Sequence, residues 1–357
     1  MKSLLQTILA LSAALLLAAC TSGMQDKIVQ GVIEDRLATA ANPLAGEGLK
    51  VLICGAGSPL PSREVAGPCV AVAAGGRVWI VDAGDGSNEN LALWRVPGQS
   101  IAGVLLTHFH SDHIAEIPDI SLAAWVAGRN EPFPIYGPAG VEEVAEGFSV
   151  AYRQSRKYRV EHHGAEFLVP AGGRFVAHPI GIGAEDAEGF SVTVLDEGGL
   201  KVTAIKVSHS PVSPAVAYRF DFAGRSVVVS GDTTRSKAIE KLAQGADVLL
   251  HEALAAHIIG QMSAGAAAAG ADRMAQITHD ILDYHTTPVE AAEAANQADV
   301  RLLVYYHLVP YPQNILFERI FLRGVSDVRD EGVMLGFDGL LIDLPPNSKE
   351  IEIGELG

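Results

Sequence analysis

Apolar runs rich in β-branched residues recur along the chain and alternate with stretches of helical periodicity. In the first half, strands are expected over residues 50–54, 69–73, 77–82 and 101–107, and helices over 117–127 and 140–152. In the second half, strands are expected over residues 201–207, 215–222, 226–230, 248–250 and 301–306, and helices over 236–243 and 288–297. Because each half places strands before helices, the pattern predicts an α/β fold. We expect an αββα sandwich of two stacked mixed β-sheets with helices on the outer faces.

The N-terminus has the pattern of a targeting segment. Lys2 precedes an uncharged apolar run over residues 4–19, which is shorter than the roughly 20 residues that span a bilayer. The run ends in Leu-Ala-Ala-Cys20, which resembles the bacterial lipobox, and Thr21 after the cysteine favours the outer membrane. An ordinary cleaved signal peptide is the alternative. We therefore expect an extracytoplasmic protein, a periplasmic lipoprotein with its lipid on Cys20.

These patterns divide the chain into four parts. We expect a lipoprotein signal peptide over residues 1–19, a tether over 20–48, one folded domain over 49–345 and a C-terminal tail over 346–357. Two cysteines, Cys54 and Cys69, lie in the folded domain, in neighbouring strand-like runs. In an oxidising compartment they would form a disulfide, whereas two buried free thiols would fit the sequence equally well.

Composition narrows the class of partner. Hydrophobic residues make up 48% of the chain and charged residues 19%, which is typical of a globular protein. The 42 acidic and 26 basic side chains leave a formal net charge of −16, which favours small ligands over polyanions. The densest basic stretch, residues 153–159, is interpreted as a solvated helix face. The charge therefore argues against nucleic acid as a partner.

Candidate chemistry concentrates where the strand over residues 101–107 ends. Four candidate ligands fall within six consecutive positions there, and a loop can turn all of their side chains toward one point; they are His108, His110, Asp112 and His113. Such a cluster could not be buried without a strong partner. Neutral imidazole and ionised carboxylate suit zinc or a similar divalent metal. The cluster therefore predicts a metal site.

The motif His-x-His-x-Asp-His resembles the signature of the metallo-β-lactamase superfamily, and the resemblance extends from Leu49 to about Asp343. It implies two divalent ions, Zn²⁺ first and Mn²⁺ or Fe as alternatives, with a metal-bridging hydroxide as nucleophile. The resemblance assigns one ion to His108, His110 and His209, the other to Asp112, His113 and His307, and Asp232 to both. It places Asp82 behind the ligands as a buttress.

Further segments resemble the ribonuclease Z and arylsulfatase-like branch of that superfamily. They are the glycine-rich loop from Cys54, the Ala-Tyr-Arg segment at 217–219, the His-Glu-Ala segment at 251–253 and the Tyr-His-Thr-Thr segment at 284–287. By this resemblance, Glu252 orients His285, which assists the leaving group, and both join Asp112 as catalytic residues. Two polar residues that cap helices are the structural alternative.

One departure from that branch bears on the substrate. The segment 218–226 runs straight into the Ser-Gly-Asp-Thr segment and leaves no room for the tRNA-gripping arm that ribonuclease Z carries there. We therefore expect a metal-dependent hydrolase of small anionic esters, phosphodiesters or aryl sulfates, with a lipid anchor as its only membrane contact. A homodimer is compatible with the sequence. The alternatives are a ribonuclease Z-type 3′-tRNA endonuclease, a lactone or β-lactam hydrolase, and a protein that keeps the metal only as a structural element.

Overall fold

The computed structural model describes residues 22–38 and 42–357 of the chain. It consists of two units, residues 1–42 and residues 43–357. The first unit contains helix α2 (Ser22–Ala38), on which Ile28, Val29 and Val32 are exposed. The expected signal peptide and Cys20 lie outside the described residues. Among the helices that are described, none is both long and apolar enough to cross a membrane.

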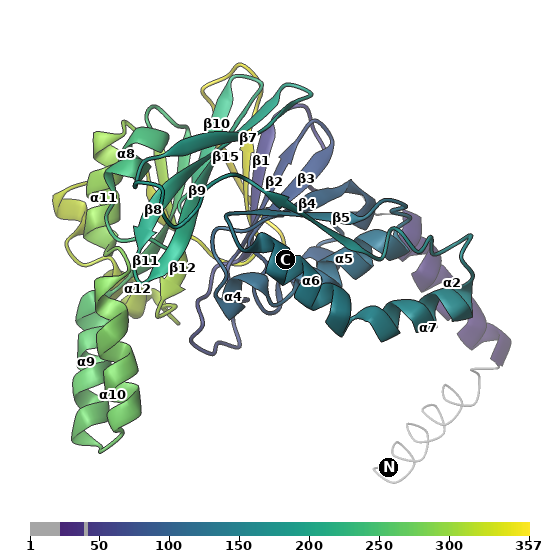
Figure 1. Cartoon of the computed structure of the whole chain (residues 1–357), viewed down its shortest axis with the longest axis horizontal. Helices are drawn as coiled ribbons and strands as arrows, with labels where there is room; N and C mark the ends of the chain where they lie inside the picture. Colours follow the sequence, from purple (N-terminus) through teal and green to yellow (C-terminus); the bar gives the residue numbers. More distant parts are fainter. Residues whose placement is uncertain (1–21, 39–41) are drawn as a thin grey trace, which may run out of the picture. The chain divides into compact units, whose positions relative to one another are not determined.

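The first sheet of the second unit has eight strands in the order β15-β14-β1-β2-β3-β4-β5-β6 (Figure 1). They are β1 (Leu49–Gly55), β2 (Cys69–Ala74), β3 (Arg77–Val81), β4 (Ile101–Leu105), β5 (Phe133–Gly137), β6 (Phe175–Pro179), β14 (Leu340–Leu344) and β15 (Glu352–Glu355). Strands β1 to β3 form an antiparallel meander, whereas β3 to β6 pair in parallel. The expected C-terminal tail, residues 346–357, instead contributes β15, which pairs with β14 at the sheet edge.

The second sheet has seven strands in the order β13-β12-β11-β10-β9-β8-β7. They are β7 (Ser191–Glu197), β8 (Leu200–His209), β9 (Val212–Phe222), β10 (Arg225–Val229), β11 (Val248–Leu254), β12 (Leu302–Val309) and β13 (Val333–Leu335). Strands β7 to β10 are antiparallel, and β10 to β13 are parallel. Both sheets are therefore mixed, as predicted.

Three layers of core hold the sandwich together, because the central strands bury side chains on both faces. Between the sheets, Val51 and Trp79 pack in one cluster with Phe220 and Val304. The outer face of the first sheet is covered by α3 (Ser87–Leu93), α5 (Ile117–Val126) and α6 (Val141–Ala151), and that of the second by α8 (Lys237–Leu242) and α11 (Pro288–Gln297). The αββα fold is thus confirmed.

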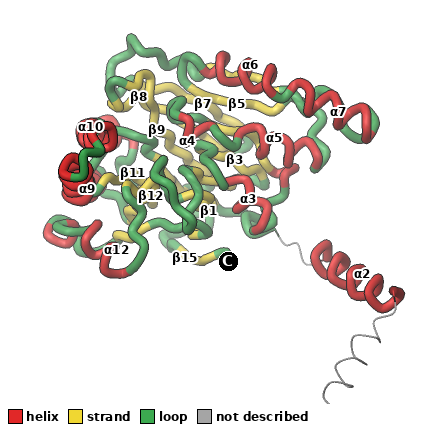
Figure 2. The backbone as a smooth tube through the Cα atoms, turned by 90° about the horizontal axis from the view of Figure 1, so that it is seen from below, coloured by secondary structure: helices red, strands yellow, loops and turns green. Residues whose placement is uncertain are grey.

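The remaining helices lie at the edges and ends of the sandwich. They are α4 (Ser111–Ile114), α7 (Arg153–His163), α9 (Ala256–Ala268), α10 (Asp272–Asp280), α12 (Ile315–Phe321) and the short η1 (Gly98–Ser100), η2 (Ile281–Asp283) and η3 (Val325–Asp327). Helices α9 and α10 form a hairpin that projects from the sandwich (Figure 1). Seen from below, α4, α5 and α7 follow one another across a single face (Figure 2).

Candidate metal centre

The predicted ligands come from loops and strand ends in both sheets. The turn after β4 and the start of α4 carry His108, His110, Asp112 and His113, whereas β8 ends at His209. Asp232 follows β10 by three positions and His307 lies near the end of β12, so these ligands come from the second sheet. The site therefore forms only where the two sheets stack.

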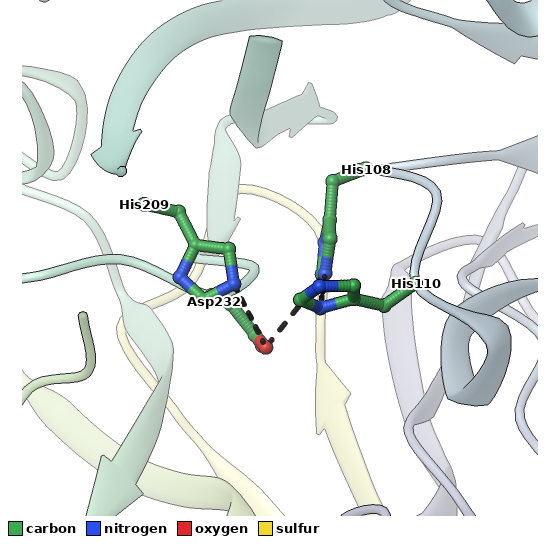
Figure 3. Close-up of side chains that lie close together, drawn as sticks. All are labelled: His108, His110, His209 and Asp232. Carbon is green, nitrogen blue, oxygen red and sulfur yellow. Dashed lines mark hydrogen bonds and ion pairs between the residues drawn. The ribbon is translucent and has the colours of Figure 1, made fainter. Parts of the chain in front are cut away.

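The seven side chains lie in two adjoining groups. They are His108, His110, His209 and Asp232 in one, and Asp112, His113 and His307 in the other. Within each group the ligand atoms lie within 4.8 Å of one another. The four residues of the first group point toward a common centre, with Asp232 below the three imidazole rings (Figure 3). All are buried except His110 and Asp112, which are half-buried and face the opening of the site.

Asp232 lies between the two groups. Its Oδ2 is 3.9 Å from His108 Nε2 and 3.8 Å from His209 Nε2, while its Oδ1 is 3.4 Å from His307 Nε2. The same Oδ2 is also 3.5 Å from His113 Nε2, so the carboxylate borders both groups, which is the position of a ligand shared by two ions. The structure thus brings together all seven residues in the grouping that the resemblance implied.

Several buried ligand atoms lack a hydrogen-bond partner among the described residues. They are Nε2 of His113, His209 and His307, and Oδ1 of Asp232. A buried polar atom without a partner is costly, so native proteins rarely leave one unless an ion or water completes it. Imidazole nitrogens and carboxylate oxygens at this spacing are a donor set for zinc-like divalent ions. The residues therefore fit a pair of metal ions.

Asp82 and Tyr284 fix the orientation of two ligands from behind. Asp82 Oδ2 accepts from His113 Nδ1 at 2.8 Å, and the backbone carbonyl of Tyr284 accepts from His209 Nδ1 at 2.8 Å. Both bonds turn the Nε2 atoms toward the centre, which sets the tautomer that a metal needs. Asp82 also accepts from the backbone N–H of Thr107 at 2.8 Å, so it holds the ligand loop as well as its histidine.

The second sheet anchors the ligand loop directly. The Tyr218 hydroxyl donates to the Leu106 carbonyl at 2.7 Å, and the Val216 N–H donates to the Thr107 carbonyl at 2.9 Å. Gly231 packs against the same loop with a φ of +58°, and a Cβ there would lie 2.7 Å from Thr107 Cβ. Glycine is thus required at this position, both for the backbone conformation and for the close approach.

Burial keeps three of the histidines neutral. Burial and the neighbouring His113 hold the pKa of His108 well below its usual value, and burial lowers the pKa of His110 and His209. Burial also opposes charge on Asp232, but the surrounding histidines outweigh it and keep its pKa well below the usual range. Neutral imidazole with an ionised carboxylate is the protonation state that binds a metal.

Glu252 and His285 form a buried pair beside the ligands. Glu252 Oε1 accepts from His285 Nδ1 at 3.1 Å and from the backbone N–H groups of Thr286 and Thr233 at 3.0 and 3.2 Å. Burial opposes charge on His285, but Glu252 outweighs it and raises the pKa of His285 to about 9. The His285 ring centre is 5.3 Å from that of His209. A protonated imidazole therefore lies within reach of a substrate at the centre, and the helix-cap alternative does not describe these contacts.

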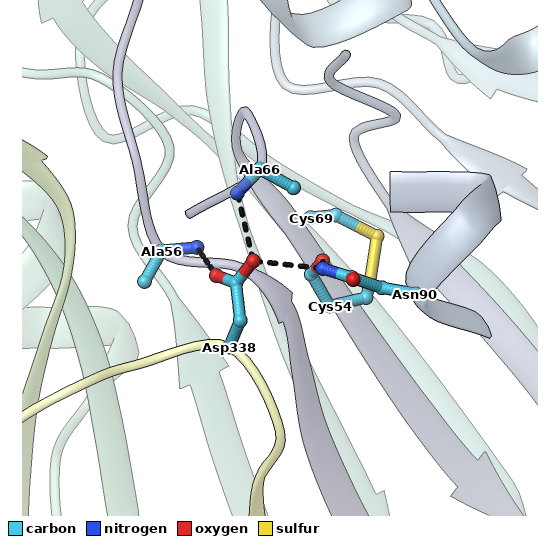
Figure 4. Close-up of a disulfide and its surroundings, with 6 residues drawn as sticks. All are labelled: Cys54, Ala56, Ala66, Cys69, Asn90 and Asp338. Carbon is cyan, nitrogen blue, oxygen red and sulfur yellow. Dashed lines mark hydrogen bonds between the residues drawn. A yellow bond between two sulfur atoms is a disulfide. The ribbon is translucent and has the colours of Figure 1, made fainter. Parts of the chain in front are cut away.

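A disulfide lies under the loop that borders the centre. Cys54 and Cys69 are bonded across β1 and β2, which settles the question that the sequence leaves open (Figure 4). The Asp338 carboxylate secures the same loop, since it accepts from the backbone N–H groups of Ala56 and Ala66 at 2.8 and 2.7 Å. Sequence reasoning missed Asp338, because an isolated aspartate near the C-terminus gives no signal. The loop and Asp112 line a cavity of about 410 Å³, which offers room for a substrate group.

The β9–β10 connection is as short as the sequence indicates. Only Ala223 and Gly224 join the two strands, with φ values of 50° and 75°. Positive φ at both positions is the pattern of a tight two-residue hairpin turn. No arm projects between β9 and β10.

The fold and the converging histidines and aspartates define the class of metal-dependent hydrolases with the metallo-β-lactamase fold. The chain belongs to this superfamily, because residues 78–308 match the family described as "Beta-lactamase superfamily domain". Over 265 residues it is 36% identical to ribonuclease Z of Mycobacterium bovis, which covers 73% of this chain and 86% of that protein. Ribonuclease Z of Mycobacterium marinum is 35% identical over 265 residues, covering 73% of this chain and 87% of that protein.

Solved structures show the same fold at lower identity. Human tRNase Z, short form, superposes with a TM-score of 0.59 at 20% identity, covering 83% of this chain and 99% of that one. The metallo-β-lactamase fold protein YhfI from Bacillus subtilis gives a TM-score of 0.57 at 19% identity, covering 84% of this chain and 100% of that one.

The expectation that nucleic acid is an unlikely partner is wrong, because the relatives at 36% and 35% identity are named as ribonucleases. The error has a physical reason. A net charge of −16 sums over the whole surface, whereas an RNA strand meets only the part near the site. The charge of a whole chain therefore does not decide which ligands its active-site face can bind.

Proposed function

We propose that this protein is a two-metal phosphodiesterase that cleaves RNA, with an activity of the ribonuclease Z type. The observation that carries the proposal is the convergence of seven metal-ligand side chains beside the buried Glu252–His285 pair. The 36% identity to a ribonuclease Z over 265 residues supports RNA as the first substrate to test. The proposal replaces the expectation of a small anionic ester.

Lewis-acid activation of water and of a phosphoryl oxygen would come from two divalent ions, with Zn²⁺ as the first choice and Mn²⁺ or Fe as alternatives. The residues that would hold them are His108, His110 and His209 for one ion, Asp112, His113 and His307 for the other, and Asp232 for both. Asp82 and the Tyr284 carbonyl would keep their histidines in the binding tautomer.

His285 and Glu252 would handle the leaving group. Hydrolysis forms a bond from a water oxygen to phosphorus and breaks the bond from phosphorus to a ribose oxygen, which leaves as an alkoxide. His285 donates a proton to that oxygen, and a proton from the water restores the imidazolium. Glu252 holds Nδ1 of the ring, so the proton is delivered from Nε2. Because the pKa of His285 is raised to about 9, the donor is charged at neutral pH.

The experiment is hydrolysis by zinc-loaded protein of a chromogenic phosphodiester and of an end-labelled RNA hairpin with a single-stranded 3′ tail. Aryl sulfate, lactone and β-lactam substrates run in parallel. We expect both phosphodiesters to be cleaved, and His110→Ala and Asp232→Asn to abolish cleavage. Protein that holds two metal ions per chain and cleaves neither phosphodiester would refute the proposal.

We further propose that the enzyme acts outside the cytoplasm as a lipoprotein modified on Cys20. The disulfide between Cys54 and Cys69 supports this location, because structural disulfides persist mainly in oxidising compartments. In a bacterial host, wild-type protein should incorporate labelled palmitate and fractionate with membranes, and Cys20→Ser should do neither. Unlabelled wild-type protein in the cytoplasmic fraction would contradict the proposal.

A further inference from the structure

Helix α7 concentrates positive charge in a chain that is otherwise acidic. Residues 153–159 contain four of the 26 basic side chains, and Arg174 lines the same surface. The helix contains one acidic residue, Glu161, whose carboxylate lies 3.7 Å from Lys157 Nζ. Arg153 and Arg156 therefore have no acidic partner on their own helix.

This arrangement does not serve the stability of the helix. Arg153, Arg156 and Arg159 follow at intervals of three residues, so like charges lie next to one another on one face. Cations in the first turn also oppose the helix dipole. None of the residues of α7 is fully buried, so core packing does not compensate for the repulsion. Charges that repel in the free protein point to an anionic partner.

A cavity of about 120 Å³ lies between α7 and α5. Its wall contains Asp119, Trp125, Tyr152, Arg156, Arg159 and Phe175, and the Asp119 carboxylate interacts electrostatically with Arg159. Arg156 Nη1 and Arg159 Nε are buried and have no hydrogen-bond partner in the described part of the chain. Arg156 is held in place, because its Nη2 donates to the Ser149 carbonyl at 2.7 Å. A phosphate drawn into this cavity would accept from these two nitrogens, Arg156 Nη1 and Arg159 Nε.

Helix α5 connects the cavity to the helix that carries two of the metal ligands. Helix α4, with Asp112 and His113, ends three residues before α5 begins, and Pro118 at the start of α5 already lines the cavity. Viewed from below, α4, α5 and α7 succeed one another across one face (Figure 2). The ten residues of α5 extend over roughly 15 Å, which a few nucleotides of RNA can bridge.

RNA fits α7 better than an anionic membrane does. A helix that lies in a membrane interface needs an apolar face, whereas the only aliphatic residue of α7 is Val160. Tyr158 is exposed between Lys157 and Arg159, and Tyr152 is exposed directly before Arg153. Exposed aromatic rings beside cations form the kind of surface on which nucleobases stack.

We propose that α7 and the cavity beside it bind the phosphate backbone of the RNA substrate. One phosphate lies at Arg156 and Arg159, and Arg153 and Lys157 contact the neighbouring backbone. This inference rests on the proposed ribonuclease function, but a separate measurement tests it. Hydrolysis of the chromogenic phosphodiester by wild-type enzyme reports on the metal centre, whereas RNA affinity reports on α7.

The experiment measures the Kd of a fluorescent 20-nucleotide RNA at several salt concentrations, with the full chain, by anisotropy. Arg156→Gln/Arg159→Gln tests the cavity, and Arg153→Gln/Lys157→Gln tests the exposed face without touching its packing. Lys237→Gln/Lys241→Gln on α8 removes the same charge elsewhere and is the matched control. We expect each α7 variant to raise Kd at least about fivefold. Each lost phosphate contact on a single strand reduces the salt slope by about 0.7, so the slope should fall by about 0.7 in Arg156→Gln/Arg159→Gln, which loses one phosphate, and by about 1.4 in Arg153→Gln/Lys157→Gln, which loses two.

Unchanged affinity and salt slope in both α7 variants would overturn the proposal, as would an equal loss in the α8 control. The same variants are tested against vesicles of anionic phospholipid. Loss of vesicle binding with unchanged RNA binding would overturn the proposal in favour of a membrane surface. If Arg156→Gln/Arg159→Gln unfolds at lower temperature than wild type, Arg153→Gln/Lys157→Gln alone decides the outcome.

Discussion

The pairing of His285 with Glu252 makes a sharp prediction for Glu252→Gln. Glutamine keeps an oxygen that can accept from the backbone N–H groups of Thr286 and Thr233, so the local packing is retained. It removes the charge that holds the proton on His285. The difference between about 9 and the ordinary histidine pKa of about 6.5 corresponds to about 3 kcal/mol in favour of the protonated ring. In Glu252→Gln that preference is lost, and burial then favours the neutral ring.

The expected loss of rate follows from the protonated fraction. At pH 7.5 a pKa of about 9 leaves about 97% of His285 protonated, whereas a pKa of about 6.5 leaves about 10%. Glu252→Gln should therefore lower kcat/KM at pH 7.5 at least about tenfold, and its alkaline limb should shift from about pH 9 to about pH 6.5 or below.

The assay measures kcat/KM for two phosphodiesters from about pH 5.5 to about 10, at the same number of metal ions per chain throughout. One releases p-nitrophenolate, which leaves without a proton, and the other releases an alkyl alcohol, which needs one. Glu252→Gln and His285→Gln should slow the alkyl ester far more than the nitrophenyl ester. Equal losses on both esters, or an alkaline limb that stays near pH 9 in Glu252→Gln, would refute the role of His285 as the proton donor.

Three further predictions concern the residue behind the metal ligands, the disulfide and the pH dependence of stability. Asp82→Asn should weaken metal binding about 10- to 100-fold, because His113 loses the acceptor that orients its ring. A competition titration with a chromogenic chelator measures this affinity, and an unchanged value would contradict the supporting role of Asp82. Cys54→Ser/Cys69→Ser should lower the free energy of unfolding by about 3 kcal/mol, as expected for a disulfide with a sequence separation of 15. Denaturant titration measures this free energy, and equal values for the variant and wild type would show that the bond is not formed. The pKa of His285 is higher in the folded protein, so its contribution to the free energy of unfolding is complete below about pH 6.5 and is lost as pH rises through about 9. The difference in the free energy of unfolding between metal-free wild type and His285→Gln should therefore shrink over that interval.

The sandwich and its ligand cluster could be predicted because both depend on local sequence. Buried strands give continuous apolar runs, and His108 to His113 fall within six positions, where chance is a poor explanation. The disulfide was undecidable from sequence, because it depends on the register of β1 against β2, which shifts between Ile53 and Gly55. The edge strand β15 was missed since none of its four residues is buried, so the segment carries no apolar signal.

The sign of the total charge was the most misleading feature of the sequence. Acidic residues are spread over the surface, while the cations of α7 are gathered on one helix. The sequence shows this cluster and predicts a solvated helix face, and Arg153 and Lys157 are exposed in the structure. The enclosed nitrogens of Arg156 and Arg159 become visible only when α7 is placed against α5.

The dispersal of the ligands over both sheets has a consequence for the order in which the enzyme matures. His108 follows the fourth strand of the domain, whereas His307 lies in β12, and the second group of ligands is incomplete without His307. A growing chain therefore offers no finished pair of metal positions until β12 has been synthesised and stacked against the first sheet. If the chain is exported unfolded, it leaves the cytoplasm without its ions, and the compartment in which it folds determines which metal it acquires.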